Sequence, residues 1–388
     1  MSLLTEERTE PVPPPPPRTP LVDPRRVLLA VAAPLLAALV ALAVASIALL
    51  ASGSNPLTVY ARMISEGTTL RSLLITVNNA VPLYLSALAV ALGFRMGLFN
   101  IGVQGQYQLA GLLAAAAGAA VTLPGPLHIL FVVVVAMAVG AAWAGVAGLL
   151  KTTRGVSEVI STIMLNVIAG GLAAYLLSAH LQERVEGSNN SRTARLPESA
   201  HFPNLDPVLR AFGVEPPQGT RLGGFLLVAV VVGVLYALVV GRSRFGFELR
   251  ATGLNPSAAV ASGVDAKRMT LITMLLSGAI AGLVGLPQLL GTSYSYGLDF
   301  QTGLGFTGIG VALLGRGSPV GIAFAALLFA FLERSSATLQ RIDVPTEIYV
   351  IMQGSIVLSV VVAYEAVRRI GVAQAERAVR RVTEPVAP

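Results

Sequence analysis

The chain repeats apolar stretches that have the length a helix needs to cross a lipid bilayer. A hydrocarbon core of about 30 Å requires roughly 20 apolar residues in an α-helix. The stretches that meet this requirement are 27–51, 73–94, 98–122, 127–150, 156–180, 222–241, 270–290 and 346–367. Only helices and closed barrels satisfy backbone hydrogen bonds in lipid. The sequence therefore predicts an all-α polytopic membrane protein.

A further apolar region, 303–333, is interrupted by Arg316, Gly317, Ser318 and Pro319. Such a cluster is typical of a turn. Each half is shorter than a full span, so the region forms either two short spans or one re-entrant hairpin. With these two helices the prediction is roughly ten transmembrane helices.

Composition supports a membrane location and excludes several classes of site. Charged residues are 12% and hydrophobic residues 54% of the chain, whereas a soluble domain carries about 25% charged residues. The chain has no cysteine, which excludes disulfides, thiolate metal sites and cysteine nucleophiles. The basic residues mostly flank apolar stretches, as expected for cytoplasmic loops, so nucleic acid is not an expected partner.

Charge also predicts the orientation in the membrane. Residues 242–269 contain five Lys or Arg against two acids, whereas 181–221 contain five against five. Cationic loops stay in the cytoplasm, so 242–269 is expected inside and 181–221 outside. Both termini are then cytoplasmic.

Three regions follow from this topology. Residues 1–26 include the unbroken proline run 13–17, which favours extended geometry, and we expect a disordered cytoplasmic tail. The transmembrane domain spans 27–367, and 368–388 form a second cytoplasmic tail.

Polar residues inside the predicted spans are the candidate pathway residues, because each costs a few kcal/mol in hydrocarbon unless it finds a partner or water. They are Asn78, Asn79, Asn100, Gln104, Gln108, Glu158, Thr162, Asn166 and Gln288. Two sets recur every four residues, one from Asn100 to Gln108 and one from Glu158 to Asn166, so each set is expected on one helical face. Such faces either join helices to one another or line a path for a neutral polar solute.

No pattern in the sequence predicts catalysis, a cofactor or a metal. Lys151 and Lys267 are the only lysines and neither follows a glycine, so a phosphate-binding G-x-x-x-x-G-K-[ST] loop is absent. His128, His180 and His201 lie at or beyond predicted span ends, where interfacial or loop roles are expected. The chain is not expected to be an enzyme, and any ATP that drives it must bind another subunit.

Four segments carry a resemblance to a known family. They are GFRMGLFNIGVQGQYQLAG at 93–111, GVSEVISTIMLN at 155–166, FELRATGLNPSAAVASGV at 247–264 and GFTGIGVALLGRGSPVG at 305–321. They resemble, in order, the N-I-G-x-E-G-Q signature, the E-V-x-x-T-x-M-L-N of the nucleoside branch, the loop that docks on the ATPase, and G-F-x-G-I-A-V-A-L-L-G-x-x-x-P-x-G. The family is the permease subunits of bacterial ABC importers for nucleosides and simple sugars, related to those for branched-chain amino acids.

The resemblance, over roughly residues 70–365, implies a pseudo-symmetric helix bundle in the bacterial cytoplasmic membrane. It also implies a second homologous permease subunit, ABC ATPase subunits and an extracytoplasmic substrate-binding protein. The residues that would couple to the ATPase are Phe247, Glu248, Arg250, Gly253, Asn255 and Pro256. Pro256 suits the first turn of a coupling helix and Asn255 the cap before it.

The sequence departs from the family pattern at three places. Gln104 and Thr307 stand where the family usually has a glutamate and often an aspartate, and Val260 and Ala261 replace an Arg-Tyr pair in the docking loop. The predicted function is an importer permease for nucleosides. A simple sugar such as ribose or a branched-chain amino acid is the alternative solute, and an ion-coupled secondary transporter is the alternative mechanism.

Overall fold

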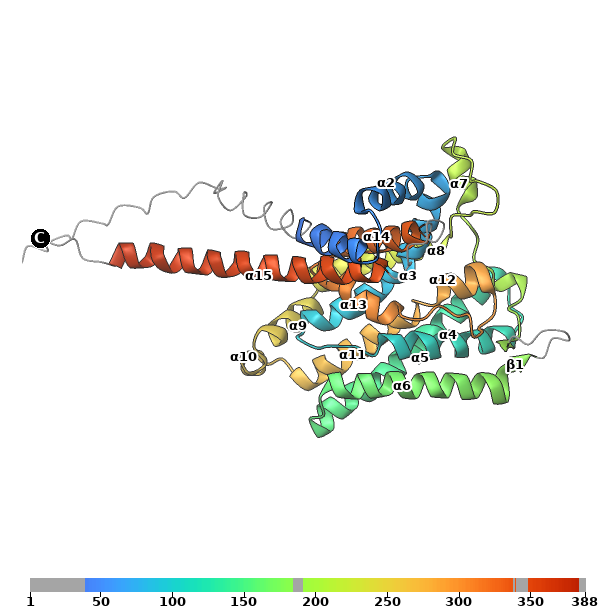
Figure 1. Cartoon of the computed structure of the whole chain (residues 1–388). Coiled ribbons are helices and arrows are strands. Elements are labelled where there is room, and N and C mark those ends of the chain that lie inside the picture. Colours follow the sequence, from blue (N-terminus) through green and yellow to red (C-terminus); the bar gives the residue numbers. More distant parts are fainter. Residues whose placement is uncertain (1–38, 184–190, 338, 340–347, 384–388) are drawn as a thin grey trace, which may run out of the picture.

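The computed structural model describes residues 39–183, 191–337, 339 and 348–383, and the expected disordered tail at 1–26 lies outside them. Figure 1 shows a bundle in which α5 (Gly125–Arg154) and α6 (Glu158–Leu176) run in nearly the same direction as α15 (Ile348–Thr383). The other helices are α2 (Pro56–Gly67), α3 (Leu70–Arg95), α4 (Val103–Ala119), α7 (Asp206–Ala211), α8 (Phe225–Arg242), α9 (Arg244–Leu254), α10 (Pro256–Ala261), α11 (Ala266–Gly282), α12 (Leu286–Gln288), α13 (Leu304–Leu314) and α14 (Pro319–Ser336). Short elements complete the described chain: the π-turns η1 (Leu177–Leu181) and η3 (Leu289–Ser293), the 3-10 turn η2 (Glu198–Ala200), and the paired strands β1 (Gln182–Glu183) and β2 (Arg192–Thr193).

The all-α polytopic class is confirmed. Six described helices are long and apolar enough to cross a membrane, and a seventh span results if the helix 39–51 and α2, which are bent by 112°, count as one. The helices 304–314 and 348–363 are apolar but shorter. The number of ten spans therefore stays a prediction. Beyond the last predicted span, α15 continues as helix through most of the segment expected to be a tail.

Helix α3 is the centre of the bundle, since α8, α11, α13 and α14 all pack against it. Its interior is buried from Ala80 to Gly93 except for the partly exposed Tyr84, and Ser86 donates a hydrogen bond of 2.9 Å to the carbonyl oxygen of Leu304 in α13. The buried hydroxyl of Ser86 thus finds its partner within the protein.

Helices α5 and α11 are in close backbone contact where they cross, and glycines occupy the crossing point. A Cβ on Gly278 would lie 2.3 Å from the carbonyl oxygen of Gly140, and one on Gly282 would lie 2.1 Å from that of Ala136. The backbones can approach this closely only because both positions lack a side chain. The spacing of Gly278 and Gly282 is thus explained by packing.

The apolar region 303–333 divides into α13 and α14, as the turn residues at 316–319 predict. Helix α13 has 11 residues, or about 16 Å at the usual helical rise, which is too short to cross the hydrocarbon core. Its turn into α14 lies beside the end of α3, because Arg95 donates a hydrogen bond of 3.1 Å to the carbonyl oxygen of Gly317. One face of the short helix is buried against the protein, chiefly against α3, while Phe306 and Leu313 are exposed.

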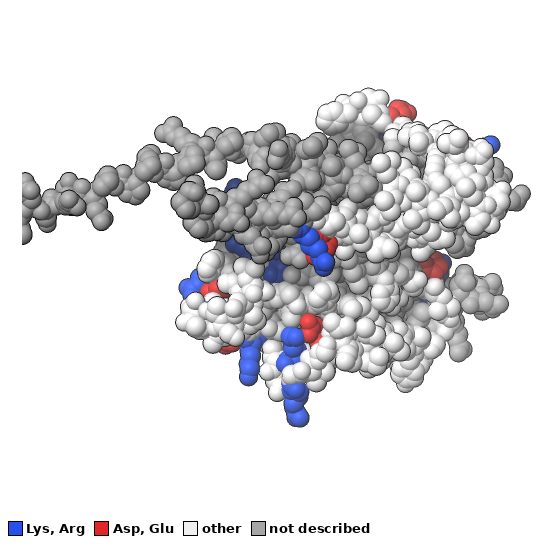
Figure 2. Space-filling view, turned by 60° about the vertical axis from the view of Figure 1, so that its left-hand side comes forward, with Lys and Arg blue, Asp and Glu red and all other residues white. Residues whose placement is uncertain are grey.

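Charge is unevenly distributed over the bundle. Figure 2 shows Lys and Arg concentrated on the part of the visible surface near α9 and α10, while most of the remaining visible surface is uncharged. The opposite end of the bundle carries β1, β2 and α7, as Figure 1 shows. These two ends are called the α10 end and the β1 end below.

Candidate functional site: a polar cleft and a buried polar network

A cleft of about 1010 Å³ opens at the β1 end. Its walls come from α3, from the segments 201–204 and 219–226, and from the interrupted helix that follows α11. Its floor is made by buried apolar side chains at Val81, Val284 and Leu304. Three of the predicted pathway residues line it: Asn78, Asn79 and Gln288.

Two of these amides form hydrogen bonds that hold the walls together. The Asn78 side chain donates to the carbonyl oxygen of Arg221 at 2.7 Å and accepts from the backbone N–H of Gly223 at 2.9 Å. The Gln288 side chain donates to the carbonyl oxygen of Asp299 at 3.3 Å and accepts from the backbone N–H of Gln301 at 2.9 Å. Each amide therefore fixes a loop segment against a helix.

The four-residue spacing predicted that Asn100 lies on one face of a membrane span. The structure instead places it in the turn before α4. It is 1% exposed, and its amide donates to the hydroxyl of Ser277 at 2.8 Å and to the side-chain oxygen of Gln106 at 3.0 Å. Its oxygen accepts from the backbone N–H of Gly102 at 3.0 Å. Asn100 thus joins the α3–α4 turn to α11.

Gln104 and Gln108 share α4 but have different surroundings. Gln104 is buried, donates to the hydroxyl of Tyr107 at 2.9 Å and accepts from the backbone N–H of Gly305 at 3.1 Å. That hydroxyl in turn donates to the carbonyl oxygen of Gln301 at 3.0 Å, so the chain of bonds reaches the wall of the cleft. Gln108 is half-buried and does not line the cleft.

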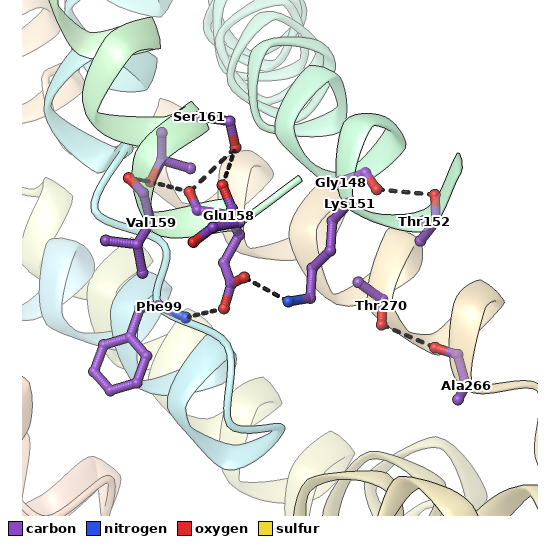
Figure 3. A network of polar contacts seen from close by, with 11 residues as sticks. Phe99, Gly148, Lys151, Thr152, Glu158, Val159, Ser161, Ala266 and Thr270 are labelled. Carbon is purple, nitrogen blue, oxygen red and sulfur yellow. Dashed lines mark hydrogen bonds and ion pairs between the residues drawn. The ribbon is translucent and has the colours of Figure 1, made fainter. Parts of the chain in front are cut away.

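The predicted set on α6 faces the turn before α4. Figure 3 shows the Glu158 carboxylate between Lys151, at 2.5 Å, and the backbone N–H of Phe99, at 3.4 Å. The Thr162 hydroxyl donates to the carbonyl oxygen of Glu158 at 2.6 Å. The Asn166 amide donates to the carbonyl oxygen of Ile101 at 2.9 Å, and its oxygen accepts from the N–H of Gly105 at 2.8 Å.

The predicted pathway residues therefore fall into two groups in the structure, those that line the cleft and those that do not. Asn100, Gln104, Glu158, Thr162 and Asn166 do not line the cleft but bond to other parts of the protein around α4 and α6, and only the bonds of Gln104 lead through Tyr107 to a cleft residue, Gln301. Gln301 and Arg221 line the cleft but lie in loops, where their type and spacing carry no signal. Among the described residues, no group of His, Asp or Glu is placed to hold a metal ion.

The predicted coupling segment forms α9 and α10 at the charged end. The Asn255 side chain accepts a hydrogen bond of 3.0 Å from the N–H of Ala258, and Pro256 begins α10, which confirms the predicted cap and first turn. Glu248 pairs with Arg244 at 2.7 Å, and the Arg250 side chain donates to the carbonyl oxygen of Val240.

One side of this segment packs on the bundle and another is exposed. A Cβ on Gly253 would lie 2.5 Å from the carbonyl oxygen of Arg95, so α9 touches the α3–α4 turn directly. Phe247 is 63%, Leu254 89% and Val260 57% exposed. Large apolar side chains at a charged end of the protein are typical of a surface that binds another protein.

Comparisons with known proteins identify the family of this chain. The sequence profile of the branched-chain amino acid transport system permease component matches residues 72–361. A glucose ABC transporter permease protein of Haloferax volcanii is 34% identical over 358 residues, which are 91% of this chain and 93% of that protein. A nucleoside ABC transporter permease protein of Lactococcus lactis is 33% identical over 85% of this chain and 90% of its own length.

A guanosine ABC transporter permease protein of Bacillus subtilis is 36% identical over 291 residues, which are 74% of this chain and 80% of that protein. No solved structure matches the chain. The profile covers most of the chain and the relatives match over nearly their whole length. The chain therefore belongs to the family of branched-chain amino acid transport system permease components, among the ABC transporter permeases for nucleosides and sugars.

Proposed function

We propose that this permease forms one half of the translocation pathway of an ATP-driven importer, and that its solute is a nucleoside. The cleft at the β1 end carries the proposal: among the residues that the structure describes, its lining combines amides with apolar walls and contains no Asp or Glu. A pocket of this kind suits a neutral solute with several hydrogen-bonding groups. A simple sugar is the second candidate, because relatives named for glucose and for nucleosides are about equally similar to the chain.

In this mechanism the cleft faces the outside of the cell, where a substrate-binding protein delivers the solute. The α10 end faces the cytoplasm, where α9 and α10 dock on an ABC ATPase. A second permease subunit completes the pathway. Both termini are cytoplasmic, and the rocking of the bundle opens the pathway alternately to either side.

The predicted pathway residues have different roles in this proposal. Asn78, Asn79 and Gln288 belong to the solute cleft. Asn100, Gln104, Glu158, Thr162 and Asn166 support the pathway by holding α4, α6, α11 and α13 together, and Gln108 is the one member of the α4 set left for a contact with the second permease.

Uptake by the complete transporter tests the proposed function. Proteoliposomes that contain the permease pair and the ATPase, supplied with the binding protein, should take up radiolabelled guanosine only when ATP is present. Glucose and leucine serve as the competing solutes. Uptake of leucine alone would contradict the solute assignment, and uptake by this chain alone under an ion gradient would contradict the mechanism.

A further inference from the structure

The polar groups of the cleft divide into two sets according to whether they already have partners. The side-chain amides of Asn78 and Gln288 form hydrogen bonds with backbone groups of the cleft walls. Within the part of the chain that the structure describes, the side chains of Asn79, Gln301 and Arg221 line the cleft without a hydrogen bond or ion pair, and the buried Nε2 of His201 and hydroxyl of Thr220 also lack a hydrogen-bond partner. Asn79 and Gln301 are half-buried, and Arg221 is exposed at the rim.

Each paired amide fixes the backbone of an unpaired residue. Gln288 accepts a hydrogen bond from the N–H of Gln301, and the Tyr107 hydroxyl donates to the carbonyl oxygen of the same residue. Asn78 donates to the carbonyl oxygen of Arg221 and is the neighbour of Asn79 on α3. The backbones are thus held while the side chains stay available, which is how a preorganised binding group is built.

The chemistry of the unpaired groups selects a class of solute. Two carboxamides and the Thr220 hydroxyl can each donate and accept, the His201 ring adds a further nitrogen, and a guanidinium only donates. Buried apolar side chains at Val81, Val284 and Leu304 line the same cleft. This combination fits a neutral molecule that has an apolar ring face and several oxygen acceptors, as a nucleoside has.

We infer that Asn79, Gln301 and Arg221 contact the solute during its passage, and that Asn78 and Gln288 act as positioning residues. This assignment rests on the proposed function and names the contacts of that same cleft. It gives different roles to Asn79 and Asn78, which are adjacent on α3, and to Gln301 and Gln288, which are joined by a hydrogen bond.

Single cysteines test the assignment without further engineering of this chain, because it contains none. In the full transporter, Asn79→Cys and Gln301→Cys should react with a membrane-impermeant methanethiosulfonate added from outside, and guanosine delivered by the binding protein should slow the reaction. Thr162→Cys is the matched control, since this similar-sized side chain is 0% exposed and lies outside the cleft. It should not react.

Alanine variants separate contact from positioning. With the loaded binding protein in excess, Asn79→Ala and Gln301→Ala should each lower the uptake rate about 5-fold, the loss expected for one hydrogen bond, with an unchanged melting temperature. Gln288→Ala should lower both uptake and melting temperature, because the backbone of Gln301 loses an anchor.

The experiments distinguish a failure of the contact assignment from a failure of the proposed function. If the wild-type transporter takes up guanosine but neither cysteine is protected, or if Gln301→Ala matches Gln288→Ala in melting temperature and uptake, the assignment of contacts is overturned and the proposed function stands. If the wild-type transporter takes up neither guanosine nor glucose, the proposed function is overturned and this assignment with it.

Discussion

Asn166 lies in the middle of α6 and forms two hydrogen bonds with the backbone around the start of α4. Asn100 and Gln104 likewise bond to backbone groups or to other side chains of the protein. At the residue scale, the amides inside this bundle therefore differ in what they bond. Most satisfy backbone groups or other side chains, whereas Asn79 and Gln301 stay unpaired beside the cleft.

We expect Asn166→Ala to destabilise the protein. The substitution leaves the N–H of Gly105 and the carbonyl oxygen of Ile101 without their partner, and an unpaired buried polar group costs about 1–3 kcal/mol. Thermal unfolding of the purified permease in detergent measures the loss. The control is Gly170→Ala on the same helix, where a Cβ would meet nothing within 4 Å. Equal melting temperatures for Asn166→Ala and the wild type would show that the two bonds contribute nothing to stability.

At the scale of elements, the α3–α4 turn connects the α10 end to the interior. Gly253 of α9 packs against its start, Glu158 of α6 accepts from the N–H of Phe99, and Asn100 bonds to Ser277 of α11. Arg95 also reaches the turn between α13 and α14. One short segment thus joins α9 to α6, to α11 and to the turn between α13 and α14.

Gly253→Ala should impair the coupling of transport to ATP hydrolysis. The added Cβ would lie 2.5 Å from the carbonyl oxygen of Arg95, which is too close, so α9 must move away from the α3–α4 turn. We expect the ATPase still to copurify, because the exposed face of α9 and α10 is unchanged, while uptake falls at least about tenfold, equivalent to about 1.4 kcal/mol.

Gly241→Ala, at the end of α8, is the matched control for this experiment. A Cβ at that position meets nothing within 4 Å, so its uptake should equal that of the wild type. Loss of the ATPase from the Gly253→Ala complex would assign Gly253 to docking, and full uptake would exclude the contact from coupling.

At the scale of the whole molecule, the two ends differ in charge and in shape. The α10 end carries the basic residues around α9 and α10, and the β1 end carries the cleft (Figures 1 and 2). Between them lie the six described helices that are long and apolar enough to cross a membrane. This polarity supports the proposed orientation, with the cleft outside.

Cysteine accessibility in whole cells measures the orientation. Gln182→Cys, on the exposed strand β1, should react with an impermeant thiol reagent in intact cells. Ser262→Cys, exposed at the end of α10, should react only after the membrane is permeabilised. The reverse pattern would place the cleft in the cytoplasm and contradict import through it.

The all-α class, the turn that divides α13 from α14 and the cap of α10 could all be predicted from the sequence, because each depends on residues that are neighbours in the chain. Hydrophobic length, turn-forming residues and a capping amide act locally. The division of the intramembrane amides into bonded and free groups could not be predicted, since a spacing of four residues defines a helical face but not what packs against it. Asn78 and Asn79 are adjacent in sequence, yet only contacts with residues more than a hundred positions away give the first its partners and leave the second beside the cleft.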